Sequence, residues 1–331
     1  MTRLTLRSTA TFVLATLAML GAFSHGQAQQ LEKFTVAGWS QPISEITNLL
    51  AEPDKGFFKA KGIDLGYVPG TGGGSAIRNM LTGEADIAFT DPGSFFAALD
   101  KGERLIAIYN IYPQNVFNVV APKSSGITGP ADLKGKRVGV YSLNSGTRQN
   151  LQVLLHQVGL SEKDIALQVT GLLNFAPVMQ GQVDATAATD TGLHIGRLKG
   201  LKDINVIEVK DYLNVPSDMF VVTEDAYRTR KDILRRFLAA YRDSAQWMID
   251  NPQEAAQIAV KRAINGKDPA VNLAIIRIRN ASSVSETTEK TGLGAFDPAL
   301  LQKGADTFRE LGLIKAKIDV SKVVSSALIP Q

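Results

Sequence analysis

The sequence predicts an α/β protein built from two lobes, each with an open, largely parallel sheet, that face each other across a cleft. The first observation is an echo within the chain: LTGEADIAFTDPGS at residues 81–94 and MQGQVDATAATD at residues 179–190 follow one plan. Each passes from a helix end through a glycine and an aspartate into small apolar residues that close on Thr-Asp. A short apolar run bounded by turn signals is typical of a buried parallel strand. The length of 331 residues accommodates about two domains, so we expect two such lobes.

The second observation is a regular alternation of strand and helix patterns in the first part of the chain. Strands are expected at residues 34–38, 63–68, 86–90 and 105–111. Helices are expected after Pro42, through residues 77–81 and over residues 93–99. Because parallel strands need crossover connections, this order indicates an open, largely parallel sheet.

The same order begins again at Phe117. Further strands are expected at residues 117–122, 137–141, 166–170, 205–209 and 219–223, with a strongly periodic helix over residues 148–158. After Asp225 strand patterns nearly vanish, and helical spacing of apolar residues predicts a helix over residues 232–251 and at least two more. We expect this helical tail to pack on the first lobe, and within it Tyr241 and Trp247 to be core residues.

The N-terminus has the features of an export signal. Arg3 and Arg7 precede an apolar stretch from Ala10 to Phe23, and small residues follow where a signal peptidase cuts. About 14 apolar residues fall short of the ~20 that a membrane-spanning helix needs. We therefore expect residues 1–28 to be a signal peptide and the mature protein to be periplasmic.

Composition excludes several classes of function. Without the two leader arginines the chain has 34 basic and 32 acidic residues, a balance that does not favour nucleic acid as a partner. The chain has no cysteine, which excludes disulfides, thiolate metal sites, a cysteine nucleophile and lipid attachment at an N-terminal cysteine. We expect no metal and no cofactor.

Polar residues follow five of the expected strands. In open parallel sheets, ligands bind beyond the carboxyl ends of the strands, where helix N-termini present unpaired N–H groups. We therefore expect a ligand cleft lined by residues 39–42, 70–75, 90–93, 142–148 and 189–192.

The segment SLNSGTR at residues 142–148 is the most informative of the five. Ser145, Gly146 and Thr147 offer hydroxyls and open backbone at a helix start, and Arg148 adds a cation suited to a carboxylate or sulfonate. The alternative is that the hydroxyls cap the helix and Arg148 faces solvent. Gly70–Ser75 lacks the last glycine of a dinucleotide fingerprint, so we interpret it as a flexible turn.

Asp91 and Asp190 each end a strand pattern. Asp91 precedes Pro92, which is typical of a helix N-cap, and Asp190 is expected to cap in the same way; contact with a ligand is compatible with capping at both. Trp39 follows the first strand, where its ring either packs on a ligand or covers the core. No catalytic motif occurs, and His194, four residues after Asp190, is the one partner for an acid-base pair; we interpret it as structural.

With these residues in place, the chain resembles the NMT1/THI5-like group of solute-binding proteins, which includes periplasmic receptors of nitrate, taurine and sulfonate ABC importers. The resemblance covers roughly residues 34–225. It is carried by GFFKAKGIDLGYVPGTGGGSAIRNMLTGEADIAFTDPGSFFAALDKG, VVAPKSSGITGPADLKGKRVGVYSLNSGTRQNLQVLLHQVGL and MQGQVDATAATD.

The resemblance implies the type II periplasmic binding protein fold, two α/β lobes joined by two crossing segments with a ligand cleft between them. Lobe I then comprises residues 29–114 and 225–331, and lobe II residues 115–224. The family's ligand positions fall on Trp39, Ser40, Gln41, Thr90, Asp91, Asn118, Ser145, Gly146, Thr147 and Asp190, and we add Arg148. Relatives often carry a Trp-Glu-Pro-like triplet where this chain has Thr189-Asp190-Thr191, so an aromatic wall is missing here.

These features favour a non-enzymatic, monomeric receptor that delivers a small organic anion, a sulfonate or carboxylate, to an ABC permease and its ATPase. Two alternatives stay open. Asp91 and Asp190, if they point inward, favour a neutral heterocycle with N–H donors, such as a thiamine-precursor pyrimidine. An exported dehydratase or lyase would use Asp190 and His194, although a chain without cysteine cannot copy the cysteine-rich motif of the family's pyrimidine-synthesising enzymes. The sequence does not separate a transport receptor from the ligand-capture subunit of a sensor.

Overall fold

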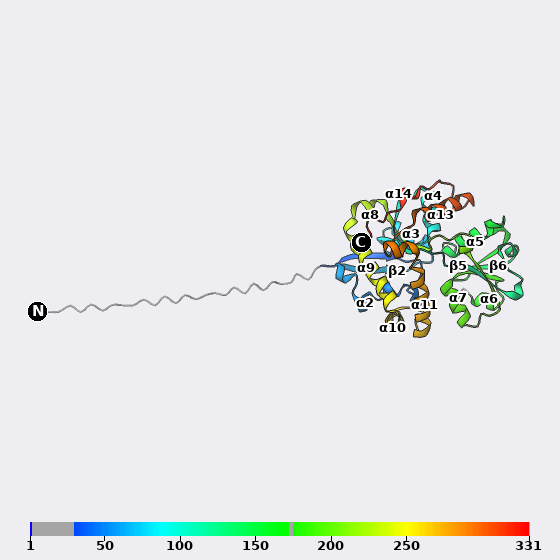
Figure 1. Cartoon of the computed structure of the whole chain (residues 1–331), viewed down its shortest axis with the longest axis horizontal. Helices are drawn as coiled ribbons and strands as arrows, with labels where there is room; N and C mark the ends of the chain where they lie inside the picture. The colour runs from blue at the N-terminus through cyan, green and yellow to red at the C-terminus, as the bar shows by residue number, and fades with distance from the viewer. Residues whose placement is uncertain (2–29, 172–174, 331) are drawn as a thin grey trace. The chain divides into compact units, whose positions relative to one another are not determined.

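The computed structural model describes Met1, residues 30–171 and residues 175–330. Apart from Met1, the expected signal peptide lies outside the described residues. From residue 31 onward the chain forms one compact unit that contains two five-stranded sheets (Figure 1). Among the residues that the structure covers, no helix is long and apolar enough to cross a membrane.

The first sheet has the strand order β2-β1-β3-β10-β4. Its strands are β1 (Glu32–Ala37), β2 (Ile63–Val68), β3 (Ile87–Thr90), β4 (Leu105–Tyr112) and β10 (Asp218–Thr223). β1 pairs in parallel with β2 and β3, whereas β10 pairs antiparallel with both β3 and β4. The predicted boundary after residue 224 assigned β10 to lobe II, but its hydrogen bonds put it in the first sheet. The lobe limits themselves stay a prediction.

The second sheet repeats this topology with the order β7-β6-β8-β5-β9. Its strands are β5 (Phe117–Pro122), β6 (Arg137–Val140), β7 (Ala166–Val169), β8 (Ala185–Thr189) and β9 (Ile204–Glu208). β6 pairs in parallel with β7 and β8, and β5 pairs antiparallel with β8 and β9. Both sheets are therefore mixed, because each contains one antiparallel strand that the largely parallel expectation did not include.

The echoed sequence segments occupy equivalent places in the two sheets. Asp86, just before β3, accepts a hydrogen bond from the backbone N–H of Thr35 in β1 at 2.7 Å. Asp184, just before β8, accepts one from the backbone N–H of Arg137 in β6 at 2.8 Å. Each aspartate thus fixes its strand beside the neighbouring one, which explains why the same residue recurs at this position.

Helices surround both sheets. Those in the first half of the chain are α1 (Thr47–Leu50), α2 (Glu52–Lys55), α3 (Gly73–Leu81), α4 (Pro92–Asp100) and α5 (Gly146–Gln157). They are followed by α6 (Ala176–Met179), α7 (Asp190–Leu198), α8 (Glu224–Thr229), α9 (Lys231–Asp250), α10 (Pro252–Arg262), α11 (Pro269–Ser282), α12 (Glu286–Thr291), α13 (Pro298–Glu310) and α14 (Val320–Val323). Short 3-10 helices are η1 (Ser44–Ile46), η2 (Lys59–Lys61), η3 (Lys123–Ser125), η4 (Pro130–Leu133), η5 (Glu162–Asp164) and η7 (Val209–Asp211).

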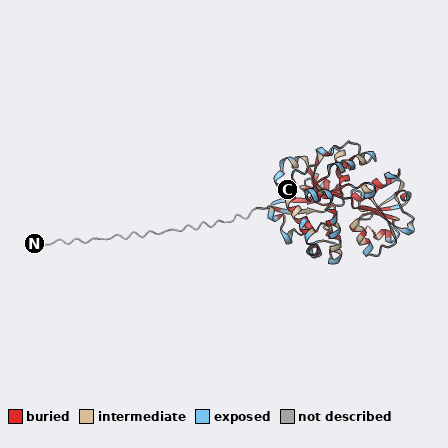
Figure 2. Ribbon diagram, viewed as in Figure 1, coloured by how far each residue is buried: buried red, intermediate tan, exposed pale blue. Residues whose placement is uncertain are grey.

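Strands β3, β4 and β10 of the first sheet are buried along nearly their whole length, and buried strands are red in Figure 2. Successive strand residues point to opposite faces, so Val36 joins one core cluster and Ala37 the other. The helical tail supplies much of this cover: Phe220 of β10 contacts Tyr241 of α9 with ring centroids 4.6 Å apart. The prediction that the tail packs on the first lobe, with Tyr241 and Trp247 in the core, is confirmed.

Two chain segments, residues 113–116 and 209–217, cross between the sheets and are hydrogen-bonded to each other. The side chain of Asn115 donates to the backbone oxygen of Leu213 at 3.0 Å, and its backbone N–H donates to Asn214 Oδ1 at 3.0 Å. The N–H of Val116 donates to Ser217 Oγ at 2.9 Å. The two crossing segments therefore run side by side as one connection.

Candidate ligand cleft

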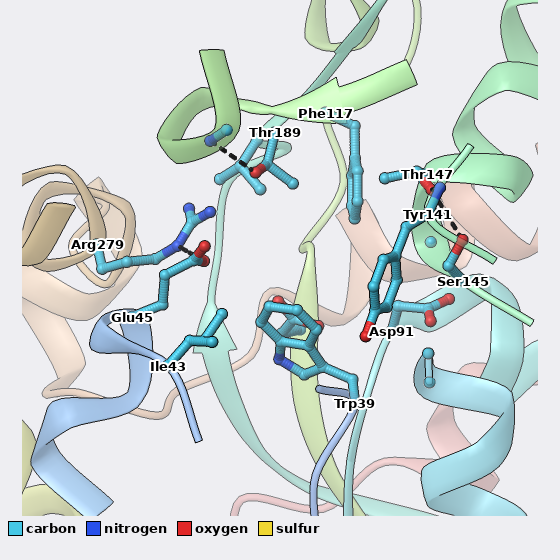
Figure 3. A pocket seen from close by; sticks show the side chains of 16 residues that line it. Trp39, Ile43, Glu45, Asp91, Phe117, Tyr141, Ser145, Thr147, Thr189 and Arg279 are labelled. Atoms are coloured by element: carbon cyan, nitrogen blue, oxygen red, sulfur yellow. Dashed lines mark hydrogen bonds and ion pairs between the residues drawn. The ribbon is translucent and has the colours of Figure 1, made fainter. Parts of the chain in front are cut away.

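A cavity of about 80 Å³ lies between the two sheets (Figure 3). The elements around the first sheet contribute Trp39, Ile43, Glu45, Gly72, Gly73, Asp91, Asp218 and Arg279 to its lining. The elements around the second sheet contribute Val116, Phe117, Tyr141, Ser145, Gly146, Thr147, Thr189 and Gly192. The volume is below the ~300 to 1,000 Å³ typical of ligand pockets, so the two lobes are close together here.

Direct contacts bridge the lobes on the α5 side of the cavity. The N–H of Gly74 in α3 donates to the backbone oxygen of Asn144 at 3.1 Å. The side chain of Gln149 in α5 donates to Ser94 Oγ in α4 at 3.0 Å. These bonds hold α5 against α3 and α4 and close this end of the cleft.

Three aromatic side chains face the cavity. Figure 3 shows Trp39, which follows β1, opposite Phe117 of β5 and Tyr141 beyond β6. A Cβ at Gly146 would lie 2.6 Å from the Phe117 ring, so glycine at the start of α5 makes room for this ring. The indole Nε1 of Trp39 has no hydrogen-bond partner among the described residues. The cavity thus offers flat apolar walls.

Asp91 caps α4 at the edge of the cavity. Its carboxylate accepts hydrogen bonds from the Ser94 N–H and from the Ser94 hydroxyl, both at 2.8 Å. Only 4% of the residue is exposed, and this burial raises its pKa to about 6 although the bonds from Ser94 favour the ionised form. A Cβ at Gly73 would lie 2.1 Å from Asp91 Oδ2, so a glycine is needed where α3 approaches the carboxylate. The predicted capping role is confirmed, and ligand contact stays a prediction.

Asp218 lines the cavity beside Asp91 and was not predicted. It is the first residue of β10, is 8% exposed, and has no side-chain hydrogen bond within the part of the chain that the structure describes. Burial, and then the charge of Asp91, raises its pKa well above the ordinary value. The sequence-based prediction considered only residues at the carboxyl ends of parallel strands. Because β10 is antiparallel, its first residue, and not its last, lies at that edge of the sheet.

Arg279 of α11 crosses from the first lobe to the second. Its Nε donates to Glu45 Oε2 at 2.6 Å and its Nη2 to Thr191 Oγ1 at 2.9 Å, while Nη1 lies 2.8 Å from Asp190 Oδ1. The guanidinium carbon lies 5.2 Å from the ring centroid of Tyr112. Figure 3 shows Arg279 pointing at Glu45 beside the cavity. Burial alone would lower the pKa of Arg279, but the charges of Asp190 and Glu45 outweigh it and raise that pKa.

The predicted site residues divide into two groups. Trp39, Asp91, Ser145, Gly146 and Thr147 line the cavity, whereas Ser40, Gln41, Thr90, Asn118, Arg148 and Asp190 are not among its lining residues. Several of the second group have other partners: the hydroxyl of Ser40 donates to the backbone oxygen of Gln41, and Asp190 pairs with Arg279. Thr90 and Asn118 are buried, with unpartnered polar side-chain atoms among the described residues.

Arg148 does not reach the cavity. Its Nε and Nη2 each donate to the carboxylate of Glu162 at 2.6 Å, and Nη1 donates to the backbone oxygen of Leu143 at 3.0 Å. Such a bidentate pair satisfies the guanidinium in place. The expectation that Arg148 offers its charge to a ligand is therefore not supported by its geometry.

The hydroxyls at the start of α5 are used within their own loop. Ser145 Oγ donates to the backbone oxygen of Ser142 at 2.7 Å, and Thr147 Oγ1 accepts from the backbone N–H of Tyr141 at 3.1 Å. On the opposite wall Thr189, and not Asp190, caps α7, since Thr189 Oγ1 accepts from the Gly192 N–H at 3.3 Å. The prediction that Asp190 is the cap is wrong because α7 begins one residue earlier than expected.

A protein-family model described as NMT1/THI5 like matches residues 43–255 of the chain. The chain belongs to the NMT1/THI5-like family. This NMT1/THI5-like protein is 21% identical over 305 residues to the riboflavin-binding protein RibY of Chloroflexus aurantiacus, with 91% of this chain and 87% of that protein covered. It is 23% identical over 253 residues to the formylaminopyrimidine-binding protein of Halalkalibacterium halodurans, with 75% and 74% covered.

Among solved structures, the NMT1/THI5-like protein is similar to the alkanesulfonate-binding protein SsuA from Xanthomonas axonopodis pv. citri bound to MOPS. The TM-score is 0.68 at 17% identity, and 88% of this chain and 98% of that chain are covered. The likeness confirms the predicted periplasmic binding protein fold. No group of three or more potential metal-ligating side chains occurs among the described residues.

Proposed function

We propose that this protein is the solute-binding component of an ABC importer and that its cleft captures a small nitrogen-containing aromatic ring. In this proposal residues 1–28 direct export to the periplasm, and a monomer delivers the ligand to a permease and its ATPase. A ligand that contacts both lobes stabilises the closed arrangement, and the permease recognises that arrangement.

The observation that carries the proposal is the carboxyl group of Asp218, buried at the cavity wall without a hydrogen-bond partner among the described residues. Because Asp218 lines the cavity, a ligand that donates to its carboxyl group can make a hydrogen bond there, whereas a ligand that cannot leaves a buried acceptor unpaired at a cost of about 1 to 3 kcal/mol. The rings of Trp39, Phe117 and Tyr141 offer flat faces for an aromatic ligand. A ring with N–H donors satisfies both features at once.

The charge of the cavity wall also favours such a ligand over an anion. Glu45, Asp91 and Asp218 line the cavity together with a single cation, Arg279. The guanidinium of Arg279 already donates to Glu45 and Thr191, and its Nη1, which makes no hydrogen bond to a described residue, lies 2.8 Å from Asp190 Oδ1. The charge of Arg279 is therefore already balanced by the carboxylates of Glu45 and Asp190. An anion would meet uncompensated carboxyl groups in a buried site.

The sulfonate or carboxylate expected from the sequence stays as a second candidate. It is supported by the N-terminus of α5, a 12-residue helix that begins at the cavity and whose dipole favours an anion. It is also supported by the structural similarity to an alkanesulfonate-binding protein. It is weakened by the pairing of Arg148 with Glu162.

The cavity volume favours one ring over a fused ring system. A neighbouring cavity of about 690 Å³ shares Ile43, Glu45 and Gly192 with the first, and the hydrogen bond from Thr191 to Glu45 stands beside both. A flavin-sized ligand would need this bond to open. We therefore favour a pyrimidine-sized ligand, the class named for the Halalkalibacterium relative.

The alternative of an exported lyase requires Asp190 and His194 to act on one bound molecule. Asp190 is paired with Arg279, and His194 is not among the residues that line the cavity. We therefore propose capture without turnover, and a search for conversion of each bound compound would detect a lyase.

The test is a thermal-shift and calorimetric comparison of residues 29–331 with formylaminopyrimidine, riboflavin and MOPS. A ligand at 100 times its dissociation constant adds about 2.7 kcal/mol of stability. We expect formylaminopyrimidine to give the largest shift and Asp218→Ala to weaken its binding roughly 5- to 150-fold, because a buried ligand group left without its hydrogen-bond partner costs about 1 to 3 kcal/mol.

Asp225→Ala is the matched control, because Asp225 is an exposed aspartate whose side chain is 73% accessible. This variant is expected to bind like the wild type. Binding of MOPS alone, undiminished by Asp218→Ala, would favour the anion and reject the heterocycle.

A further inference from the structure

Asp91 and Asp218 occupy neighbouring positions at the end of an antiparallel strand pair. Met219 of β10 is the register partner of Thr90 in β3. One step further along each strand leads to Asp218 and Asp91, so the two residues stand opposite each other, and both line the cavity wall. The charge of Asp91 acts on the carboxyl group of Asp218. Their residues are 8% and 4% exposed. Two acidic groups thus meet where little water reaches them.

The two carboxyl groups differ in the partners that the fold provides. Asp91 accepts two hydrogen bonds from Ser94 at the N-terminus of α4, which favour its ionised form. The carboxyl group of Asp218 accepts no hydrogen bond from any described residue. Two negative charges close together in a buried site are unfavourable, so one of the two carboxyl groups keeps a proton. Asp218 is that group, because no hydrogen-bond donor stabilises its ionised form.

We propose that Asp91 and Asp218 hold one proton between them at neutral pH, and that this proton makes the cleft selective for a ligand edge that both donates and accepts hydrogen bonds. The selectivity rests on the function proposed above, whereas the shared proton is a property of the empty protein.

The surroundings do not supply a cation that would let both groups ionise. Arg279 is the cation that influences Asp218, but its Nε and Nη2 donate to Glu45 and Thr191, and its Nη1 lies 2.8 Å from Asp190 Oδ1. The titratable and charged groups that influence Asp218 from the elements packed around it are Asp91, Glu45, Asp190, Arg279, Tyr112 and Tyr241. Three of these are carboxyl groups, so the balance of charge opposes ionisation of Asp218.

A protonated Asp218 presents an O–H donor beside a carbonyl acceptor. An aminopyrimidine offers the complementary pair, a ring nitrogen that accepts and an adjacent amino group that donates. A sulfonate offers acceptors only and leaves the Asp218 carbonyl oxygen and the Asp91 carboxylate facing negative oxygens. The pair therefore distinguishes the two ligand classes by hydrogen-bond pattern as well as by charge.

The shared proton is tested without any ligand, by urea unfolding of residues 29–331 from pH 5 to pH 8. A carboxyl group whose pKa is raised by folding binds a proton in the native state that the unfolded chain has released. The free energy of unfolding therefore falls as pH rises through this window. For one proton, the folding equilibrium constant decreases tenfold per pH unit. We expect the Asp218→Asn variant to lose the part of this pH dependence that one bound proton causes. We expect the Asp225→Asn control to keep the pH dependence of the wild type.

An Asp218→Asn protein with the same slope as the wild type overturns the proposal. If this variant does not fold, infrared spectroscopy of the wild type decides instead. We expect the carbonyl band of a protonated carboxyl group at pH 7, and a spectrum without that band overturns the proposal equally.

Ligand selectivity is then read by calorimetry with formylaminopyrimidine at the same pH values. We expect its affinity to fall with rising pH in the wild type, about tenfold per pH unit once the pair loses its proton, and to be independent of pH in Asp218→Asn. A pH-independent affinity in the wild type would reject the selectivity. If neither formylaminopyrimidine nor riboflavin binds, the proposed function fails, while the unfolding slopes still decide whether the proton is shared.

Discussion

Replacement of Arg279 by Met is expected to destabilise the protein strongly. The guanidinium is 2% exposed and joins Glu45, Asp190 and Thr191 at 2.6 to 2.9 Å. Met keeps most of the side-chain volume but removes the positive charge, which leaves the Glu45 carboxylate 12% exposed with no cation against it. Asp190 is about one third exposed, so water compensates part of its loss.

The expected cost is about 3 to 5 kcal/mol, the range measured when one partner of a buried ion pair is removed. An unfolding entropy of ~2.1 cal/mol/K per residue over about 300 residues makes each kcal/mol worth ~1.6 °C, so the melting temperature should fall by roughly 5 to 8 °C. The assay is urea unfolding at pH 7 with calorimetry as a second measure. Glu45→Gln in the Arg279→Met background should recover part of the loss, because it removes the unpaired charge.

Arg262→Met is the matched control. Arg262 also pairs with an aspartate at 2.8 Å, but its side chain is 38% exposed. Exposed pairs contribute little, so this variant should unfold close to the wild type. Equal destabilisation by the two substitutions, or an Arg279→Met protein as stable as the wild type, would refute the role given to burial.

Three further predictions concern the cavity wall and the residues around it. Arg148→Ala should leave the affinity for any bound panel compound unchanged in calorimetry, because its guanidinium is held by Glu162. Gly73→Ala should cost about 1 to 3 kcal/mol in urea unfolding and weaken binding, since the new Cβ would lie 2.1 Å from Asp91 Oδ2 and 2.6 Å from Thr90 Oγ1. Thr189→Ala should lower the free energy of unfolding by about 1 kcal/mol, because α7 loses its N-cap; urea unfolding measures this change.

The sequence predicted the strand positions well because local patterns determine them. The span expected for β2 is the one observed, and those for β3 and β4 differ by one residue at one end. The echo was also informative, since Asp86 and Asp184 make the same backbone contact in the two sheets. Residues that follow a strand directly, such as Trp39 and Asp91, were correctly expected to line one cavity.

The residues that were missed come to the cavity through long-range packing. Asp218 lies there only because β10 enters the first sheet antiparallel, which no local pattern determines. Arg279 left a signal that was not used: it continues the helical spacing of the buried Ile275 and Ile276, where an apolar residue is expected. An arginine on the buried face of a helix needs a carboxylate partner, and the sequence does not say which one.

Arg148 is a residue that the sequence placed at the site and the structure does not. Its place at a helix start beside Ser145 and Thr147 suggested an anion site, but Glu162 lies only 14 residues further along the chain and binds it. The choice between a ligand and a neighbouring carboxylate depends on where η5 packs, and periodicity does not reveal this.

The paired crossing segments have a consequence for how such a receptor can change its ligand. Residues 115–217 form a continuous piece of chain whose two ends are joined by the bonds of Asn115 and Val116. A piece with adjacent ends can be exchanged between relatives as a cassette, or cut to give new termini, with little disturbance of the host. Phe117 and Tyr141 would travel with that cassette, while Asp91 and Asp218 stay behind. Recombination at two neighbouring points can therefore replace one wall of the cleft and keep the other.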